Sequence, residues 1–376
     1  MSPGAPGVEA TVGGQKVFVC NGRLTPTEVP EPGKQGKLLP GWSLVRNGFC
    51  LLTDQSLPLA QADFDKTPGQ FISPCLFRFA GGSEAEHVAA DAPAARVAPT
   101  PFLAYYKHMA EAAKVAFPEA EYVVVNGHIA FSAEVSPLKQ VGVLLGRMAK
   151  AALSSLLFKL LPCCAPLEPA EPDSGKQVPP FGATEWLHVD ASAQELAGRL
   201  ERLLGPGEPG GRSQHWAGAQ KLRLPGKFLS GAKGKRRVTS INMWRNQRAH
   251  AVIKSHHLAV LDAQSISEQE LHAAKFKNYA IGGQEQYHLG KLQEGHRLVY
   301  FPDMAQSEIL VFKQGAYVVE PGPVDGEYRA TPAADAHTNF VFHTSFVDPT
   351  APKDALARKS VVCAGVLIIM PETETD

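Results

Sequence analysis

The sequence predicts an α+β fold that is mainly β, with a jelly roll or sandwich at its centre and flanking helices. From Val238 to Met370 the chain consists of short apolar segments separated by turn residues, a pattern typical of all-β sandwiches and jelly rolls. Abundant Gly (34) and Pro (30) favour many turns. Helical spacing of apolar residues is confined to a few stretches, which we expect to pack outside the strands.

The N-terminal part is expected to contribute short strands and one helix. Strands are predicted at 16–20, 42–45 and 49–52, and the Ala-, Glu- and Pro-rich segment 84–100 is predicted to be a loop. A helix is predicted from Pro101 to Ala116, ending before Pro118 because proline cannot continue the hydrogen-bond ladder. Tyr122 to Asn126 is β-branched and predicted to be a buried strand.

The middle of the chain contains the clearest helical pattern. From Pro137 to Leu161 the leucines recur at i, i+3 and i+4, which predicts a helix that faces the core. Its basic residues leave a second interpretation open, a helix on a membrane surface or a partner. Residues 163–180 read as a Pro- and Glu-rich loop, and Ala193 to Leu204 as a further helix.

The remaining strands complete the expected organisation, a single domain over residues 1–376. They are predicted at 238–244, 257–261, 296–301, 308–312, 339–346 and 360–370. Residues 1–136 would flank the core, residues 137–180 would form the amphipathic helix and loop, and residues 181–370 would form the jelly roll with a metal site.

Composition excludes several classes of protein. Lys+Arg and Asp+Glu are both 37, so the chain lacks the basic excess of a nucleic-acid-binding protein. The most apolar stretch, 140–161, is interrupted by Arg147, Lys150 and Lys159, which argues against a membrane span. Six cysteines without a C-x-x-C pair and an N-terminus without a secretory pattern indicate reduced thiols in a cytoplasmic protein. The oligomeric state stays open.

His188-Val189-Asp190 is the most informative short motif. On a strand, residues i and i+2 point to the same face, so His188 and Asp190 could chelate one metal while Val189 faces the core. A third ligand is needed, and His343 in the apolar run 340–346 is favoured over His337, which lies in a loop-like segment. Two imidazoles and one carboxylate are the ligands of a non-haem Fe(II) site with open positions.

Arg358, fifteen positions beyond His343, is a candidate for co-substrate binding. Its guanidinium can hold a carboxylate bidentately, and near ferrous iron the natural carboxylate is the distal one of 2-oxoglutarate. Lys359 is the alternative, since neighbours on a strand face opposite ways. Arg245 is a second cofactor-binding candidate. Arg245, Arg248 and Trp244 lie beside a predicted strand and could instead bind a carboxylate of a small-molecule substrate, as could Lys275 or Lys277.

Several longer motifs, in the same order along the chain, resemble the CmcJ/NvfI family, the AsaB-type hydroxylase/desaturases. They are Ile241–Arg245, Leu258–Asp262 with Ser265, His296–Met304, Ser307–Lys313, His343–Pro349 and Arg358–Val361. The resemblance covers about residues 185–362. It implies an Fe(II)/2-oxoglutarate-dependent oxygenase whose fold is a double-stranded β-helix, that is, a cupin-like jelly roll. Such an enzyme uses O2 to hydroxylate, desaturate or cyclise a specialised metabolite and releases succinate and CO2. By the same resemblance, His188, Asp190 and His343 are the metal ligands and Arg358 the 2-oxoglutarate anchor.

The chain also departs from the family pattern. Val362 and Ala364 stand where the family has Glu and Arg, and Asn246 follows the Trp-Arg pair in place of Pro. Loss of a charge at Ala364 puts the mode of co-substrate or substrate binding in doubt. Two other functions stay open at this point. One is a non-catalytic jelly-roll binding protein, and the other is a zinc hydrolase with the same His/Asp/His ligands.

Overall fold

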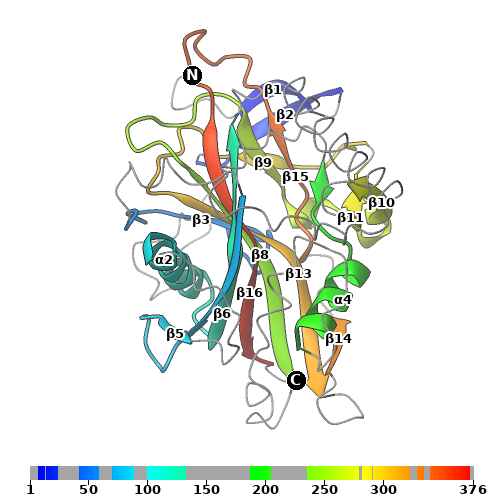
Figure 1. Ribbon diagram of the computed structural model, residues 1–376. Coiled ribbons are helices and arrows are strands. Elements are labelled where there is room, and N and C mark those ends of the chain that lie inside the picture. Colours follow the sequence, from blue (N-terminus) through cyan, green and yellow to red (C-terminus); the bar gives the residue numbers. More distant parts are fainter. Residues whose placement is uncertain are drawn as a thin grey trace, which may run out of the picture.

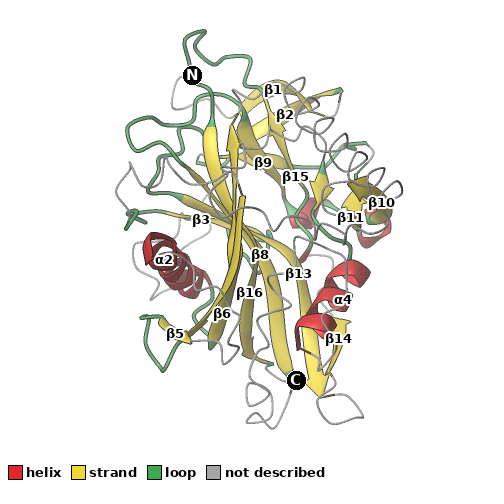
Figure 2. Ribbon diagram, in the orientation of Figure 1, coloured by secondary structure: helices red, strands yellow, loops and turns green. Residues whose placement is uncertain are grey.

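The computed structural model describes residues 7–12, 14–23, 42–58, 70–88, 100–132, 187–204, 235–278, 282–289, 291–321, 328–333 and 339–372. Strands dominate this part of the chain, and they gather into two sheets with a helix on either side (Figures 1 and 2). The helix predicted at 137–161, the loop predicted at 163–180 and His337 lie outside the described residues.

Each sheet combines strands from distant parts of the sequence. In order, sheet A contains β1 (Gly7–Val12), β2 (Gln15–Asn21), β12 (Leu298–Tyr300), β9 (His257–Leu261), β15 (His343–Phe346), β7 (His188–Val189), β11 (Gly282–His288) and β10 (His272–Asn278). Sheet B contains β14 (Tyr328–Pro332), β13 (Ile309–Pro321), β8 (Arg236–Asn246), β16 (Lys359–Pro371), β6 (Tyr122–Ser132), β4 (Gln70–Arg78) and β5 (Glu86–Val88), while β3 (Phe49–Leu52) pairs with β13.

The chain alternates between the sheets, which is the signature of a jelly roll. After β7 in sheet A it passes to β8 in sheet B, returns to β9 in sheet A, and later runs β13, β15 and β16 in sheets B, A and B. Apolar side chains of both sheets meet between them, among them Trp244, Val260, Val299 and Phe312. The predicted mainly β fold with a jelly-roll core is therefore confirmed.

The two described helices cover different faces of sheet B. Helix α2 (Thr100–Ala116) begins with proline in its first turn, and Lys114 donates to the Pro118 and Ala120 carbonyls at its end. It buries Tyr105, Tyr106 and Met109 against the outer face. Helix α4 (Ala193–Leu204) is capped by Ser192, whose Oγ accepts from the Glu195 amide, and it packs Leu196 and Leu200 against β13 and β16.

Most predicted elements in the described residues are present, and the differences lie in one turn and in strands that were not predicted. Residues 42–48 form a turn, not the predicted strand at 42–45, because the Asn47 amide donates to the Ser43 carbonyl and the Asn47 side chain accepts from the Ser43 amide. The loop predicted at 84–100 contains β5, which pairs with the end of β4. Strands β1, β4 and β14 and the hairpin of β10 and β11 were not predicted.

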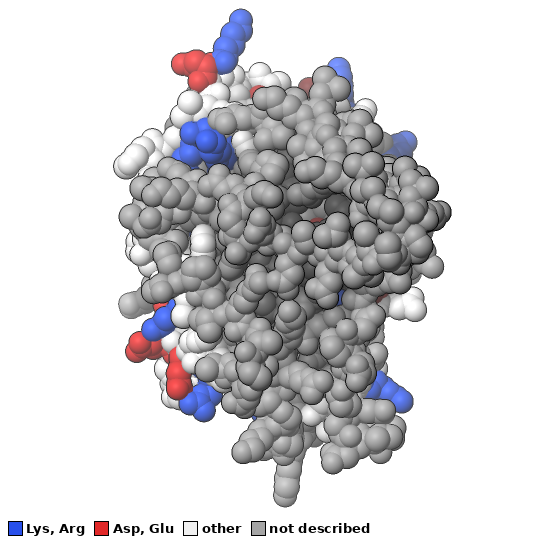
Figure 3. All heavy atoms as spheres, viewed as in Figure 1, with Lys and Arg blue, Asp and Glu red and all other residues white. Residues whose placement is uncertain are grey.

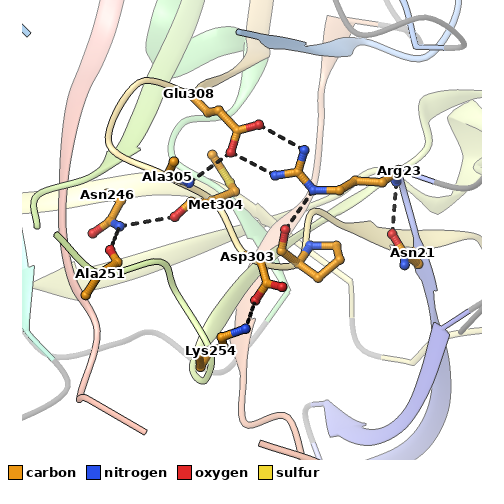
Figure 4. A network of polar contacts seen from close by, with 10 residues as sticks. Asn21, Arg23, Asn246, Ala251, Lys254, Asp303, Met304, Ala305 and Glu308 are labelled. Atoms are coloured by element: carbon orange, nitrogen blue, oxygen red, sulfur yellow. Dashed lines mark hydrogen bonds and ion pairs between the residues drawn. The ribbon is translucent and has the colours of Figure 1, made fainter. Parts of the chain in front are cut away.

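The connection between β12 and β13 is held by a polar network, shown in Figure 4. Arg23 donates to both carboxylate oxygens of Glu308, at 2.9 and 2.7 Å, and to the Pro302 carbonyl. Glu308 also accepts from the Ala305 amide, and Lys254 pairs with Asp303 at 2.6 Å. This network orients the start of β13, the strand that carries Phe312 and Gln314 toward the interior.

Charged side chains on the described surface are mixed in sign. In Figure 3 acidic and basic residues lie beside each other near α2 and β5, where Arg78 pairs with Glu86 and Lys107 with Glu84. This mixing agrees with the balance of charges in the sequence.

Candidate metal centre

Two histidines face each other on neighbouring strands of sheet A. β7 pairs with β15 so that His188 lies directly opposite His343, and their ring centroids are 4.3 Å apart. Both side chains are buried, and the ring of Phe312 from sheet B lies 4.8 Å from that of His343. His188 and His343 come from positions 155 residues apart in the sequence, so only the folded jelly roll brings them together.

Asp190 completes the cluster. Strand β7 ends at Val189, which turns into the apolar core outside sheet A, and Asp190 points back to the side of His188, as the i, i+2 rule predicts. Asp190 Oδ1 lies 3.5 Å from His188 Nε2 and 3.8 Å from His343 Nε2. All three ligand atoms lie within 4.8 Å of one another. The structure therefore brings together the three residues that were predicted from the sequence to bind a metal.

The protonation states suit metal binding. Burial, together with the neighbouring His188, lowers the pKa of His343 to about 4, so this imidazole is neutral at pH 7. Burial alone would raise the pKa of Asp190, but its hydrogen bond to His188 and the proximity of His343 hold that pKa well below its usual range. His343 Nδ1 lies 3.4 Å from the Val341 carbonyl, which leaves Nε2 as the ring nitrogen available to a metal.

The donor set fits a divalent transition metal with open coordination positions. Imidazole nitrogens and a carboxylate oxygen suit iron, zinc and related ions, and three protein ligands leave room for other molecules. Among the described residues, no fourth His, Cys, Asp or Glu joins this group. A closed structural zinc site, which requires four protein ligands, is therefore not what the described residues form.

Arg358 lies inside the jelly roll, close to the strand of His343. Its side chain is buried, and its guanidinium lies 5.7 Å from the ring centre of Trp244. Arg358 Nη1 donates to the His256 carbonyl at 2.7 Å and lies 3.4 Å from Ser345 Oγ. Ser345 follows His343 by two positions on β15, so both point to one face, about 7 Å apart along the strand. Burial lowers the pKa of Arg358 to about 10, and the group stays charged at neutral pH.

Two polar atoms beside this site have no partner. Arg358 Nε and Ser360 Oγ are both buried without a hydrogen bond in the described part of the chain. Buried polar groups are nearly always satisfied, so these two atoms indicate a place for a polar ligand. Ser360 was not among the residues predicted from the sequence, although it lies two positions beyond Arg358, at the start of β16.

The structure does not place Arg245 at the metal centre, which corrects the expectation that it binds a cofactor. Arg245 is fully buried on the outer face of β8, the face opposite Trp244, where α2 covers it. Its Nε donates to the Gln306 carbonyl at 3.0 Å and its Nη2 to the Gln55 carbonyl at 2.9 Å. Alternation along β8 turns Arg245 away from the interior, and its hydrogen bonds give it a structural role.

The other cations considered for a substrate carboxylate gain no support. Arg248 donates to the Ala357 carbonyl at 3.1 Å. Lys275 and Lys277 belong to β10, but their side chains are outside the described part of the structure. Lys359, the alternative to Arg358, is the first residue of β16, is partly buried and pairs with Ser132 of β6.

The positions that depart from the family pattern have clear local roles. Asn246 donates to the Ala251 carbonyl at 2.6 Å and to the Met304 carbonyl at 3.1 Å, and it accepts from the Arg248 amide (Figure 4 shows the first two contacts). Val362 is buried between the sheets, and Ala364 packs against the same apolar cluster. At these two positions the chain therefore places apolar surface where the family pattern has charges.

The solved structures with a similar fold include two of an endoperoxidase. One is an "iron and alpha-ketoglutarate-dependent endoperoxidase NvfI with different conformation", with a TM-score of 0.50 and 14% identity over 96% of this chain and 86% of that chain. The other is a tryptophan-to-phenylalanine variant of the same endoperoxidase, with a TM-score of 0.50 and 13% identity over 96% and 84%. At this identity the likeness concerns the fold, and at that level it confirms the resemblance that the sequence motifs indicated.

Comparison with protein families gives a further match. No curated protein is significantly similar to the chain in sequence. In the described part of the chain, neither helix has the length and apolarity needed to cross a membrane. The family model described as "Oxidoreductase/YMDC permease-like domain" matches residues 173–366, more than half of the sequence and the whole span of the three clustered ligands. The chain therefore belongs to the oxidoreductase/YMDC permease-like domain family.

Proposed function

We propose that the protein is an Fe(II)/2-oxoglutarate-dependent oxygenase that oxidises a small molecule with release of succinate and CO2. The observation that carries this proposal is the convergence of His188, Asp190 and His343, with a buried arginine on the face of β15 that bears His343. A metal with open positions beside a buried cation suits a ligand that is a metal chelator at one end and a carboxylate at the other.

His188 Nε2, Asp190 Oδ1 and His343 Nε2 would hold the iron. When bound, the iron supplies the binding and activation of O2 and of the keto acid. Arg358 would bind the distal carboxylate of 2-oxoglutarate, and Ser360 would donate a further hydrogen bond. This assignment gives partners to Arg358 Nε and Ser360 Oγ, the two buried atoms that lack them.

Apolar side chains lie beside His343 and Arg358. Phe312 contacts the His343 ring, and Trp244 lies under the Arg358 guanidinium. Both belong to the apolar cluster between the sheets, together with Val362. Because Arg358 is buried, its attraction to a carboxylate would be stronger than in water. Since Arg245 lies on the outer face of β8, away from the metal centre, it does not support a carboxylate on the oxidised substrate.

We also propose that residues 1–376 form one oxygenase domain and that the protein is cytoplasmic. N-terminal strands extend both sheets of the core, since β2 pairs with β12 in sheet A and β6 pairs with β16 in sheet B. This sharing of sheets supports a single domain over the described residues.

Succinate formation tests the proposed function. The purified protein is incubated in air with Fe(II) and 2-oxoglutarate, and succinate is quantified against a His343→Ala variant. We expect succinate in the native sample at a rate well above that of the variant, since the variant has lost a metal ligand. Equal rates in the two samples would contradict the proposal.

A further inference from the structure

The carboxylate of Asp190 is held by sheet B, although the two histidines belong to sheet A. Its two oxygens have different surroundings. Oδ1 faces the nitrogens of His188 and His343, whereas Oδ2 accepts a hydrogen bond of 2.7 Å from Asn242 Nδ2 on β8. The oxygen that faces the histidines is therefore the one placed to bind a metal together with them, and the other accepts from Asn242.

The orientation of the Asn242 amide is fixed from its other side. Asn242 Oδ1 accepts a hydrogen bond of 3.0 Å from the Gly365 amide on β16. A backbone N–H can only donate, so it requires the Asn242 oxygen and directs the Asn242 NH2 group to Asp190. Asn242 is buried, which excludes water as a competing partner for this amide.

Gly365 can serve in this way because the strands are irregular here. The pairing of β16 with β8 shifts register between Cys363 and Val366, and Gly365 has a φ of 63°, which is the left-handed region that favours glycine. The carbonyl of Gly365 accepts from Asn126 Nδ2 on β6. Hydrogen bonds therefore connect the irregular segment of β16 to β8 on one side and to β6 on the other.

A second irregularity in sheet B holds the backbone of Asp190. Between Lys313 and Gly315, β13 shifts register against β8. Gln314 at this point accepts a hydrogen bond of 2.9 Å from the Asp190 amide and donates one of 3.0 Å to the Lys313 carbonyl. Asp190 lies just beyond the end of β7, so Gln314 replaces the ladder partner that the strand no longer provides.

From these contacts we infer that Asn242 and Gln314 are positioning residues that set Asp190 as a ligand through Oδ1 alone. Asn242 fixes the carboxylate, and Gln314 fixes the main chain that carries it. The assembled ligand set then depends on the spacing of the two sheets, since its histidines move with sheet A and its carboxylate is held by sheet B. The inference rests on the proposed metal centre and deepens it.

Titration with Co(II) tests the inference without requiring any oxygenase activity. Co(II) binds His and carboxylate ligands, is stable in air, and reports its coordination through d–d absorption. Asn242→Ala removes the donor to Asp190 Oδ2. Ser240→Ala is the matched control, because Ser240 lies on the same strand and face but is not a donor to Asp190 in the described part of the chain.

We expect Asn242→Ala to weaken Co(II) binding about tenfold to a hundredfold, as is usual for partners of metal ligands. Its d–d bands should also lose intensity, because a released Oδ2 can bind the metal and raise the coordination number. Ser240→Ala should bind as the native protein does. If Asn242→Ala does not fold, Gln314→Ala gives the same test through the Asp190 backbone, with the same loss of affinity expected.

The possible failures are distinguishable. Native affinity and spectrum in a folded Asn242→Ala or Gln314→Ala variant would overturn the positioning role and leave the proposed function standing. A native protein that binds no Co(II) would overturn the metal centre on which both proposals rest. Strong Co(II) binding that weakens in the variants, in a protein that forms no succinate, would support the positioning role and refute the oxygenase.

Discussion

Replacement of Arg358 by Gln should abolish tight binding of 2-oxoglutarate and leave the metal bound. Arg358 is buried, charged and adjacent to Ser345, two positions from the ligand His343. A charge-assisted hydrogen bond in such surroundings contributes about 1.5–3 kcal/mol, so losing one raises the Kd of 2-oxoglutarate about tenfold to a hundredfold. Arg358→Lys should give a smaller loss, because it keeps the charge without the bidentate fork.

The assay is anaerobic calorimetric titration of 2-oxoglutarate into the protein loaded with Fe(II). Because Arg358 also donates to the His256 carbonyl, the thermal stability of each variant is measured alongside. Lys359→Gln is the control for charge, since it removes the neighbouring cation outside the proposed site. A folded Arg358→Gln variant with the native Kd for 2-oxoglutarate would refute the reasoning.

Two further predictions concern buried groups outside the metal centre. Arg245→Met should lower the free energy of unfolding in urea by about 3 kcal/mol, because the Gln306 and Gln55 carbonyls lose their donor. The Kd of this variant for 2-oxoglutarate should equal that of the native protein. A weaker Kd with native stability would show that Arg245 does belong to the site. Burial lowers the pKa of His257 to about 4, although Asp348 opposes this shift. As pH falls from about 6.5 toward 4, His257 takes up a proton in the unfolded chain but not in the folded protein, so acid favours unfolding. Between pH 7 and pH 5 the free energy of unfolding of the native protein should fall by about 2 kcal/mol through this group. The His257→Gln variant should not show this part of the loss. Equal losses in the two proteins over this pH range would show that His257 is not the group responsible.

The elements that the sequence predicted correctly are those whose signal is local. Short apolar strands such as β9 and β15 are recognisable from their own residues, and the i, i+2 rule was enough to place His188 and Asp190 on one side of β7. His343 was identified because a polar residue in an apolar strand needs a partner. The hairpin of β10 and β11 was missed because its sequences, rich in Lys, Gln, Gly and Ala, carry a weak strand signal.

What the sequence could not reveal depends on tertiary contacts. Alternation places Trp244 and Arg245 on opposite faces of β8, but only the folded sheet shows which face meets α2 and which meets the metal centre. Asn242 and Gln314 act across irregularities in β13 and β16 whose positions no local pattern marks. Several residues of the family-like motifs, such as Asp262 with its bonds to Asn47 and Gln264, stabilise turns. Residues of this kind explain a resemblance in fold, but they are not among the proposed metal ligands.

The central claim, that His188, Asp190 and His343 bind iron which in turn binds 2-oxoglutarate, is tested most directly by an anaerobic titration. Metal-free protein receives Fe(II) and then 2-oxoglutarate, and visible absorption is recorded for the native protein and for Asp190→Ala. The account predicts the charge-transfer band of a keto acid chelated to ferrous iron in the native protein and no such band in the folded variant. No band in the folded native protein, or an equal band in both, would contradict the account.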